Sequence, residues 1–269
     1  MSAADPVSAP AAPALRLLGA PALIGPDGEI AFTAERPFQL LAYLAVRGVW
    51  VRRDELADLL YPGRELEAAR SNLRKVLLLA RRVDGAGAIE QQGDLLRWQP
   101  DSDLRRFEQA CDAGRHGDAV ALYAGPLLHG VDLGGSPAGA AWLVAERSRL
   151  EGRWHDAALR RLRELDSDPA AAEALAQVLL RHDPLDDEAM QALLSAQGRQ
   201  GRAGEALQRL ARYSRELAGS LELPPSAALQ QLGHALRSGT AAQPASVSAP
   251  PEDSPLIGRS AQGAQIHTE

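Results

Sequence analysis

The 269-residue chain contains one cysteine, Cys111, and one lysine, Lys75. A lone cysteine forms no disulfide within the chain, and the six histidines are scattered without the Cys/His spacing of a zinc site. Cys111 falls in a helical pattern, so we expect a small buried core residue rather than a nucleophile. The chain also lacks a signal-like N-terminus and any apolar run long enough to span a bilayer. We therefore expect a cytoplasmic protein that does not bind membranes.

The sequence motifs of common enzyme classes are missing as well. Gly134–Ala138 lacks the closing glycine of a nucleophile elbow, and no phosphate-binding G-x-x-x-x-G-K-[ST] loop occurs. Asp183 and the run Asp186–Glu188 are expected to cap and start a helix, where carboxylates suit the positive end of the helix dipole. The histidines are expected at the surface or in caps. We predict no catalytic centre, no cofactor and no metal site.

Charge is unevenly distributed along the chain. The formal net charge is -6, yet residues 1–100 carry 12 Arg/Lys and 12 Asp/Glu, so the acidic excess lies entirely in the remainder. This distribution excludes a general binder of polyanions. Contact with nucleic acid would have to come from a local basic patch in the first 100 residues.

The most informative stretch is residues 68–83, AARSNLRKVLLLARRV, which holds five basic side chains and no acidic one. At about 100° per residue, one face of a helix collects the apolar side chains of Leu73, Val76, Leu77 and Ala80. The opposite face carries Ser71, Lys75 and Arg82, with Arg74 beside them. Such a helix is suited to a phosphate-lined groove. The alternative is a solvated surface helix, because most charged faces contact only water.

The elements around this basic helix give its context. Two short apolar runs, Leu15–Leu18 and Ala22–Ile24, are followed by a Gly-Pro-Asp-Gly turn and by Glu29–Thr33, and together they predict a small antiparallel sheet. Helices are predicted over Glu35–Arg47 and Asp54–Leu60 before the basic helix, and a hairpin over Ala88–Gln99 after it. Two helices, a basic helix and a hairpin follow the order of a winged helix-turn-helix.

From Asp101 onward the pattern is purely helical. Helices are predicted over Leu104–Ala113, Asp118–Tyr123, Pro137–Asp166 (one helix or two joined), Ala170–His182, Glu188–Gly198, Ala203–Leu217 and Pro224–Arg237. Alanines where helices approach are typical of a degenerate tetratricopeptide-type (TPR-like) solenoid. The predicted fold class is mainly α, an N-terminal α+β winged helix-turn-helix (14–100) followed by an all-α TPR-like domain (101–240). Residues 1–13 are expected to be disordered and 241–269 to be a linker.

Seven motifs, in their order along the chain, resemble those of the bacterial transcriptional activator domain family, which includes the Streptomyces antibiotic regulatory proteins. They are Arg36–Ala45, Val51–Leu60, Ala69–Arg74, Asp103–Glu108, Leu122–Leu128, Trp142–Arg147 and Gly201–Leu207. The resemblance implies an OmpR-type winged helix that binds double-stranded DNA and a TPR-like activator domain. It also implies binding as a homodimer and contact with RNA polymerase.

Two features depart from the family pattern. Leu78 and Leu79 are predicted to lie on the outer face and the flank of the basic helix, where family members are usually polar. The wing is reduced to Gly93–Arg97, with Arg97 as its only cation. In addition, Pro255–Arg259 resembles the start of an ATPase module that larger family members carry after this linker.

The predicted DNA contacts combine phosphate neutralisation with a few contacts to base edges. They comprise Arg70 and Arg74 (guanine or phosphate), Ser71 and Lys75 (base or backbone), Arg81 and Arg82 (phosphate), Arg52 and Arg53 (backbone across the groove) and Arg97 (wing). In the alternative interpretation, Arg53 or Arg70 pairs with Glu55 or Glu67 and makes no contact with DNA.

The sequence thus predicts a DNA-binding transcriptional regulator, specifically an activator, and not an enzyme. One rival hypothesis is a protein-interaction scaffold with a vestigial winged helix, in which Leu78 and Leu79 contact a partner protein. Another is the N-terminal sensor or adaptor part of a larger ATPase regulator, suggested by Leu256–Arg259.

Overall fold

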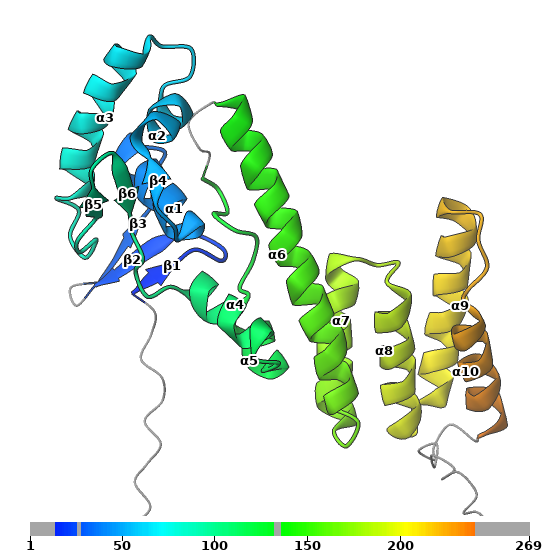
Figure 1. The fold of residues 1–269 in the computed structure, drawn as a ribbon. Coiled ribbons are helices and arrows are strands. Elements are labelled where there is room, and N and C mark those ends of the chain that lie inside the picture. Colours follow the sequence, from blue (N-terminus) through cyan, green and yellow to red (C-terminus); the bar gives the residue numbers. More distant parts are fainter. Residues whose placement is uncertain (1–13, 26–27, 132–135, 240–269) are drawn as a thin grey trace, which may run out of the picture.

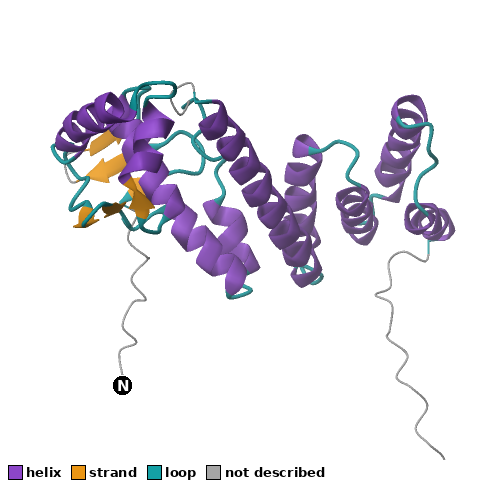
Figure 2. Ribbon diagram, turned by 45° about the horizontal axis from the view of Figure 1, so that its top comes forward, coloured by secondary structure: helices purple, strands orange, loops and turns teal. Residues whose placement is uncertain are grey.

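A computed structural model describes residues 14–25, 28–131 and 136–239. The chain forms a head of mixed helices and strands (β1 to β6, Leu15–Arg97) and an arm of helices (α4 to α10, Asp103–Ser238), which extends away from it (Figure 1). Figure 2 shows every drawn strand in the head and only helices along the arm. The predicted fold class is confirmed. The expectations for residues 1–13, for the centre of the predicted turn at 26–27, and for 134–135, 241–269 and Pro255–Arg259 lie outside the described residues.

The head contains two small antiparallel sheets. The first has the order β1-β2-β3 and confirms the predicted sheet, with strands Leu15–Arg16, Ala22–Gly25 and Gly28–Ala31. The second has the order β4-β6-β5, with strands Val51–Arg52, Leu95–Arg97 and Glu90–Gln92. Its hairpin β5–β6 was predicted, but β4 was not. A two-residue strand is too short to show alternation of apolar and polar side chains.

The head also has three helices, α1 (Arg36–Arg47), α2 (Arg53–Leu60) and α3 (Leu66–Ala80); α1 and α2 contact the second sheet, and α3 packs on α1 and α2. α1 ends at Gly48, whose φ of 60° places it in the left-handed conformation that glycine adopts without strain. The shared core is rich in fully buried leucines, including Leu40, Leu41, Leu44, Leu56 and Leu60. Each such side chain stabilises the fold by about 1.5–3 kcal/mol through removal from water.

The arm is built from seven helices in its described part: α4 (Asp103–Asp112), α5 (His116–Leu122), α6 (Pro137–Glu164), α7 (Pro169–His182), α8 (Asp187–Arg199), α9 (Ala203–Ser220) and α10 (Ala227–Ser238). The region predicted as one long helix or two is the single helix α6, which lies between the head and α7 to α10 in Figure 1. Side-chain oxygens cap several of these helices, and Asp186 caps α8 as predicted.

Three histidines bridge helices of the arm instead of serving as isolated surface or capping groups. His116 on α5 lies 2.5 Å from Glu164 on α6, and His155 on α6 lies 2.6 Å from the α8 cap Asp186. His182 on α7 pairs with Glu151 on α6 at 2.9 Å. The expectation for Cys111 holds only in part, because its side chain is half-buried at the edge of the core. Burial raises the pKa of its thiol.

The head is joined to the arm by one buried carboxylate, that of Asp103 in the first turn of α4. Its Oδ1 accepts N–H groups from Leu17 and Leu104 at 2.7 Å each, and its Oδ2 accepts the N–H of Leu18 at 3.0 Å. Asp103 is only 5% exposed, and its carboxylate is bound by two N–H groups that follow β1 and by one N–H group of α4.

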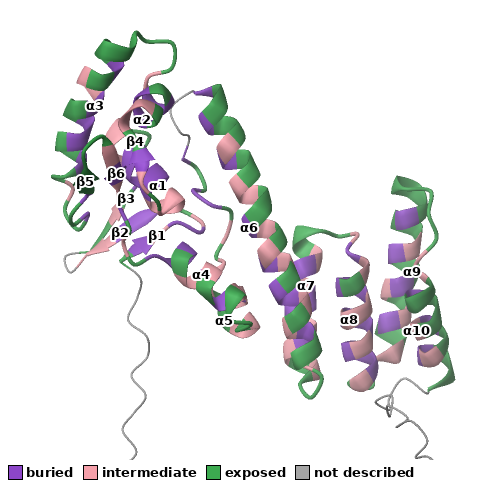
Figure 3. Cartoon of the chain, viewed as in Figure 1, coloured by how far each residue is buried: buried purple, intermediate pink, exposed green. Residues whose placement is uncertain are grey.

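Further contacts support this joint. The Leu128 N–H donates to the Leu17 carbonyl, while the Arg147 guanidinium on α6 donates to the carbonyls of Leu127 and Leu128. Trp142, near the start of α6, packs against Tyr43 of α1 with ring centroids 4.7 Å apart. Figure 3 shows buried positions gathered inside the head and on the facing sides of the arm helices. The start of the arm therefore packs directly on the head.

Replacement Asp103→Ala tests the joint. It leaves three buried N–H groups without an acceptor, each costing about 1–3 kcal/mol, so the free energy of unfolding should fall by at least about 3 kcal/mol. Urea denaturation measures this loss. The control is Asp101→Ala, which removes only an exposed pair with Arg106 and should cost less than about 1 kcal/mol. Equal losses in the two variants would contradict the assigned role.

The contribution of Asp103 to the stability of the fold should depend on pH. Burial raises the pKa of Asp103 to about 6 from its usual 3.8, against the opposing effect of the N–H donors. A raised folded-state pKa means that this stabilising contribution is complete below the unfolded value and is lost as the pH rises through about 6. The stability difference between the wild type and Asp103→Ala should therefore be larger at about pH 5 than at about pH 7.5. An unchanged or larger difference at the higher pH would contradict this assignment.

Candidate nucleic-acid interface

Helices α2 and α3 form a packed pair joined by a tight turn. Gly63 in that turn has a φ of 71°, which a residue with a Cβ adopts only with strain. α3 buries the predicted apolar stripe of Leu73, Val76, Leu77 and Ala80 against α1 and α2, and Ala69 is buried with it. The opposite side of α3 consequently faces solvent, as the exposed positions on this helix in Figure 3 show.

The side chains on this solvent side define the α3 outer face: Arg70, Ser71, Arg74, Lys75, Leu78 and Leu79. Leu78 is 53% exposed and Leu79 is 50% exposed, which confirms that both leucines lie outside the core. Arg74 and Lys75 are exposed and have no acidic partner among the residues that the structure describes. The face thus presents two unpaired cations, with Leu78 one turn further along.

The helix bounds correct one expectation. α3 begins at Leu66, two residues before the basic stretch, so its first turn also includes the acidic Glu67. It ends at Ala80, where tight turns follow and Gly85 adopts a φ of 80°. Arg82 therefore lies beyond the helix and does not share a helical face with Lys75. Arg81 follows the last helical residue, and its Nη2 donates to the Gln91 amide oxygen of β5 at 3.3 Å.

Arg70 is held by an acid on the neighbouring helix. Its Nε and Nη2 donate to the two carboxylate oxygens of Asp54 on α2 at 2.6 and 2.7 Å. This bidentate pair lowers the pKa of Asp54. The alternative interpretation is therefore right that Arg70 forms an ion pair, but wrong about the acid, which is Asp54 and not Glu55 or Glu67. Periodicity along one helix gives no information about a contact that depends on how two helices cross.

The hairpin β5–β6 forms the predicted wing beside these helices. Gly93 at its tip has a φ of 57°, and the Asp94 carbonyl accepts the N–H of Arg53 at the start of α2. Arg97 lies over the Trp50 ring at 4.5 Å and pairs with Glu90 at 2.6 Å. The single cation of the wing is therefore neutralised within the wing itself.

The remaining predicted contacts lie at the start of α2. Arg52 is exposed and precedes the helix, so its side chain is accessible. Arg53 is half-buried, and its Nε has no hydrogen-bond partner within the described part of the chain. Arg53, Arg70, Ser71, Arg74 and Lys75 thus lie on the pair of helices α2 and α3, with Arg52 just before α2, and their accessibility differs.

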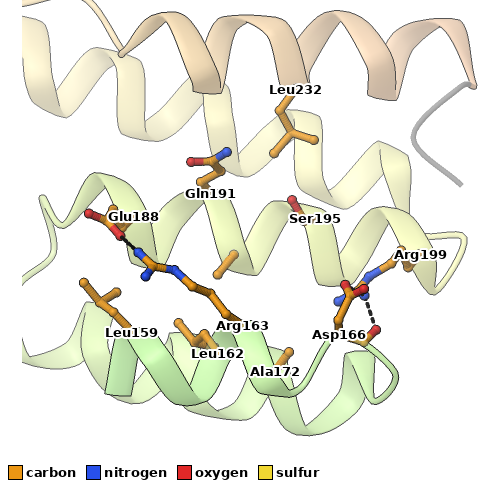
Figure 4. A pocket seen from close by; sticks show the side chains of 11 residues that line it. Leu159, Leu162, Arg163, Asp166, Ala172, Glu188, Gln191, Ser195, Arg199 and Leu232 are labelled. Carbon is orange, nitrogen blue, oxygen red and sulfur yellow. Dashed lines mark hydrogen bonds and ion pairs between the residues drawn. The ribbon is translucent and has the colours of Figure 1, made fainter. Parts of the chain in front are cut away.

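The arm contains a groove of about 700 Å³ between α6, α7, α8 and α10 (Figure 4). Leu159, Leu162 and Leu232 contribute apolar surface from opposite walls. Ion pairs lie toward its two ends, Arg163 with Glu188 and Arg199 with Asp166. Both signs of charge line this groove.

Two structural observations bear on other kinds of site. Within residues 14–25, 28–131 and 136–239, no cluster of three or more His, Cys, Asp or Glu side chains is suited to hold a metal ion. Among the helices in those ranges, none combines the length and apolar character needed to cross a membrane.

Comparisons with known proteins agree with this architecture. The chain is similar in structure to Mycobacterium tuberculosis EmbR, which was solved in complex with a low-affinity phosphopeptide, with a TM-score of 0.55. The match covers 84% of this chain and 67% of EmbR at 20% sequence identity, so it shows the fold alone. No curated protein matches the chain in sequence.

The sequence itself matches the bacterial transcriptional activator domain over residues 99–237, which is more than half of the chain. The match covers the arm from just before α4 to α10. The chain therefore belongs to the bacterial transcriptional activator domain family.

Proposed function

We propose that the protein is a DNA-binding transcriptional activator whose α3 enters the major groove of promoter DNA. The observation that carries this proposal is the α3 outer face, where Arg74 and Lys75 are exposed and unpaired within the described residues of a chain with a net charge of -6. Two cations retained without acidic partners in an acidic protein suit the phosphates and base edges of DNA.

The geometry around α3 distributes the contacts. Lys75, Arg74 and Ser71 project from the helix and supply contacts to base edges or to the nearest phosphates. Arg52 at the start of α2 and Arg82 beyond α3 contact the backbone on either side. Arg81 and Arg53 contact the DNA backbone after small side-chain movements. Both lie close to the wing, Arg81 through its bond to Gln91 and Arg53 through its N–H bond to Asp94.

Two predicted DNA contacts take a lesser role in this proposal. Arg70 and Arg97 are each held by a carboxylate, those of Asp54 and Glu90. An arginine paired with a carboxylate attracts a phosphate only weakly, because the pair has little net charge. Its main effect is therefore on the position of α3 or of the wing. Family membership and the EmbR-like fold support a regulator of transcription.

The arm supplies the protein contacts of an activator in this proposal. Its groove between α6, α7, α8 and α10 offers apolar walls with ion pairs toward the ends, which suits a polypeptide partner better than a nucleic acid. RNA polymerase and a second copy of the chain are the partners that the proposed function calls for. Pull-down of RNA polymerase and sedimentation of the full chain distinguish them.

The rival function is a protein-interaction scaffold, favoured by the exposure of Leu78 and Leu79. Salt dependence separates the two functions. A DNA-binding face gives a log K that falls with log salt at about -0.9 per phosphate contact, whereas a scaffold has little affinity for DNA at any salt. The ATPase-adaptor hypothesis depends on Leu256–Arg259, outside the described residues.

Replacement of both Arg74 and Lys75 by alanine should weaken binding to duplex DNA and flatten the salt dependence by up to about 1.8 in slope. Both side chains are exposed, so the fold should be unaffected. Fluorescence anisotropy with a labelled duplex, titrated from low to physiological salt, measures both quantities. The matched control is Arg212→Ala with Arg215→Ala, which removes the same charge from exposed positions on α9. Unchanged affinity in the folded α3 variant, or an equal loss in the control, would contradict the proposal.

Replacement Asp54→Asn should strengthen DNA binding, because it removes an acid beside α3 and releases Arg70. The salt dependence should steepen by about 0.9 if Arg70 gains one phosphate contact. Thermal stability should change little, since exposed ion pairs contribute weakly.

The matched control for this variant is Asp58→Asn on the same helix, whose exposed carboxylate has no ion pair among the described residues. If Asp58→Asn strengthens binding equally, only the overall charge matters. Weaker binding by Asp54→Asn would show that the pair is needed to hold α3 in place.

A further inference from the structure

Leu78 lies beside two unpaired cations, Arg74 and Lys75, on the α3 outer face of the described residues. It follows Arg74 by four residues and Lys75 by three, so the two cations flank it one helical turn earlier on the same side of α3. It is 53% exposed, and the side chains that anchor α3 lie on the opposite side of the helix. Leu78 therefore projects outward and adds little to the core of the head.

The surroundings of Leu78 are unlike a protein-docking patch. Contact surfaces for proteins are contiguous apolar areas of several hundred Å². The other large apolar side chains exposed on α3 are Leu79, next to it, and Leu66 at the far end of the helix. Two adjacent leucines beside unpaired Arg74 and Lys75 give a small apolar spot within a positive surface, so the charge favours a polyanion as the occupant.

The major groove of DNA offers one apolar group on its base edges, the C5-methyl group of thymine. The α3 outer face has cations that suit the phosphates and, beside them, an aliphatic side chain that suits a thymine methyl group. We propose that Leu78 is a specificity-determining residue that packs against a thymine methyl group in the site bound by α3. This inference rests on the proposed function, because it requires α3 to lie in the major groove.

Leu79 provides an internal comparison. It is exposed to nearly the same extent, 50%, but lies about 100° further around the helix, on the side of Lys75 away from Arg74. A helix in a groove directs only its outermost side chains at base edges. Leu79 therefore lies at the margin of the contact, and its truncation should leave the preference for thymine unchanged.

The test begins with the full wild-type chain and a pool of random duplexes, from which bound sequences are enriched at physiological salt. Each thymine of the enriched site is then replaced in turn by deoxyuridine, which pairs identically but lacks the methyl group. Anisotropy titrations compare the wild type with Leu78→Ala and with the control Leu79→Ala. Alanine is a good helix former, so both variants should keep α3 intact.

At one thymine, or one symmetry-related pair, deoxyuridine should weaken wild-type binding roughly fourfold, as expected for one methyl group removed from contact. Leu78→Ala should bind the thymine duplex more weakly and be indifferent to deoxyuridine at that position. Leu79→Ala should keep the wild-type sensitivity. This pattern across the three proteins would support the assignment of Leu78 to the methyl group.

The opposite outcomes are distinct. Enrichment of a site at which no thymine is sensitive to deoxyuridine, or equal sensitivity in the wild type and Leu78→Ala, overturns the role of Leu78 and leaves the proposed function standing. Enrichment of a site without thymine has the same meaning. Failure to enrich any duplex overturns the proposed function together with this inference.

Discussion

The Asp103 carboxylate accepts three backbone N–H groups, two of them from residues just after β1 and one from the first turn of α4. Without these hydrogen bonds, an ionised Asp103 would be a buried charge with no partner. The hydrogen bonds therefore favour one arrangement of β1 and α4 at the joint. The contact of Trp142 with Tyr43 adds a second attachment between α6 and α1. The orientation of α3 relative to the arm depends on these attachments.

The head and the rest of the chain differ in their charge. The acidic excess of the chain lies beyond residue 100, whereas unpaired cations are exposed on the α3 outer face. In the proposed function, the acidic excess beyond residue 100 repels phosphates, which favours the approach of DNA to α3 over approach to the arm. Within the head, Asp54 and Glu90 neutralise Arg70 and Arg97, which leaves Arg74 and Lys75 as the unpaired cations of the α3 outer face among the described residues.

Local sequence patterns predicted the features that depend on periodicity. The inner stripe of α3 and the exposure of Leu78 followed from helical spacing, and the wing followed from its turn residues. Contacts between elements were not predictable in this way: Arg70 pairs with Asp54 across a helix crossing, and Asp103 contacts a strand far away in the sequence. Arg82 was misplaced because the helix ends at Ala80, and one basic run continued through the boundary. The roles of individual α3 side chains toward DNA stay predictions.

The central claim is that the head binds DNA through a few cations on and around α3. The most direct measurement is the affinity of the full wild-type chain for mixed duplex fragments as a function of salt concentration. The account predicts binding at low salt with a slope of roughly -3 to -5 in log K against log salt, as for a few phosphate contacts, and one preferred fragment retained near physiological salt. Absence of binding even at low salt would contradict it and favour the rival function of a protein-interaction scaffold.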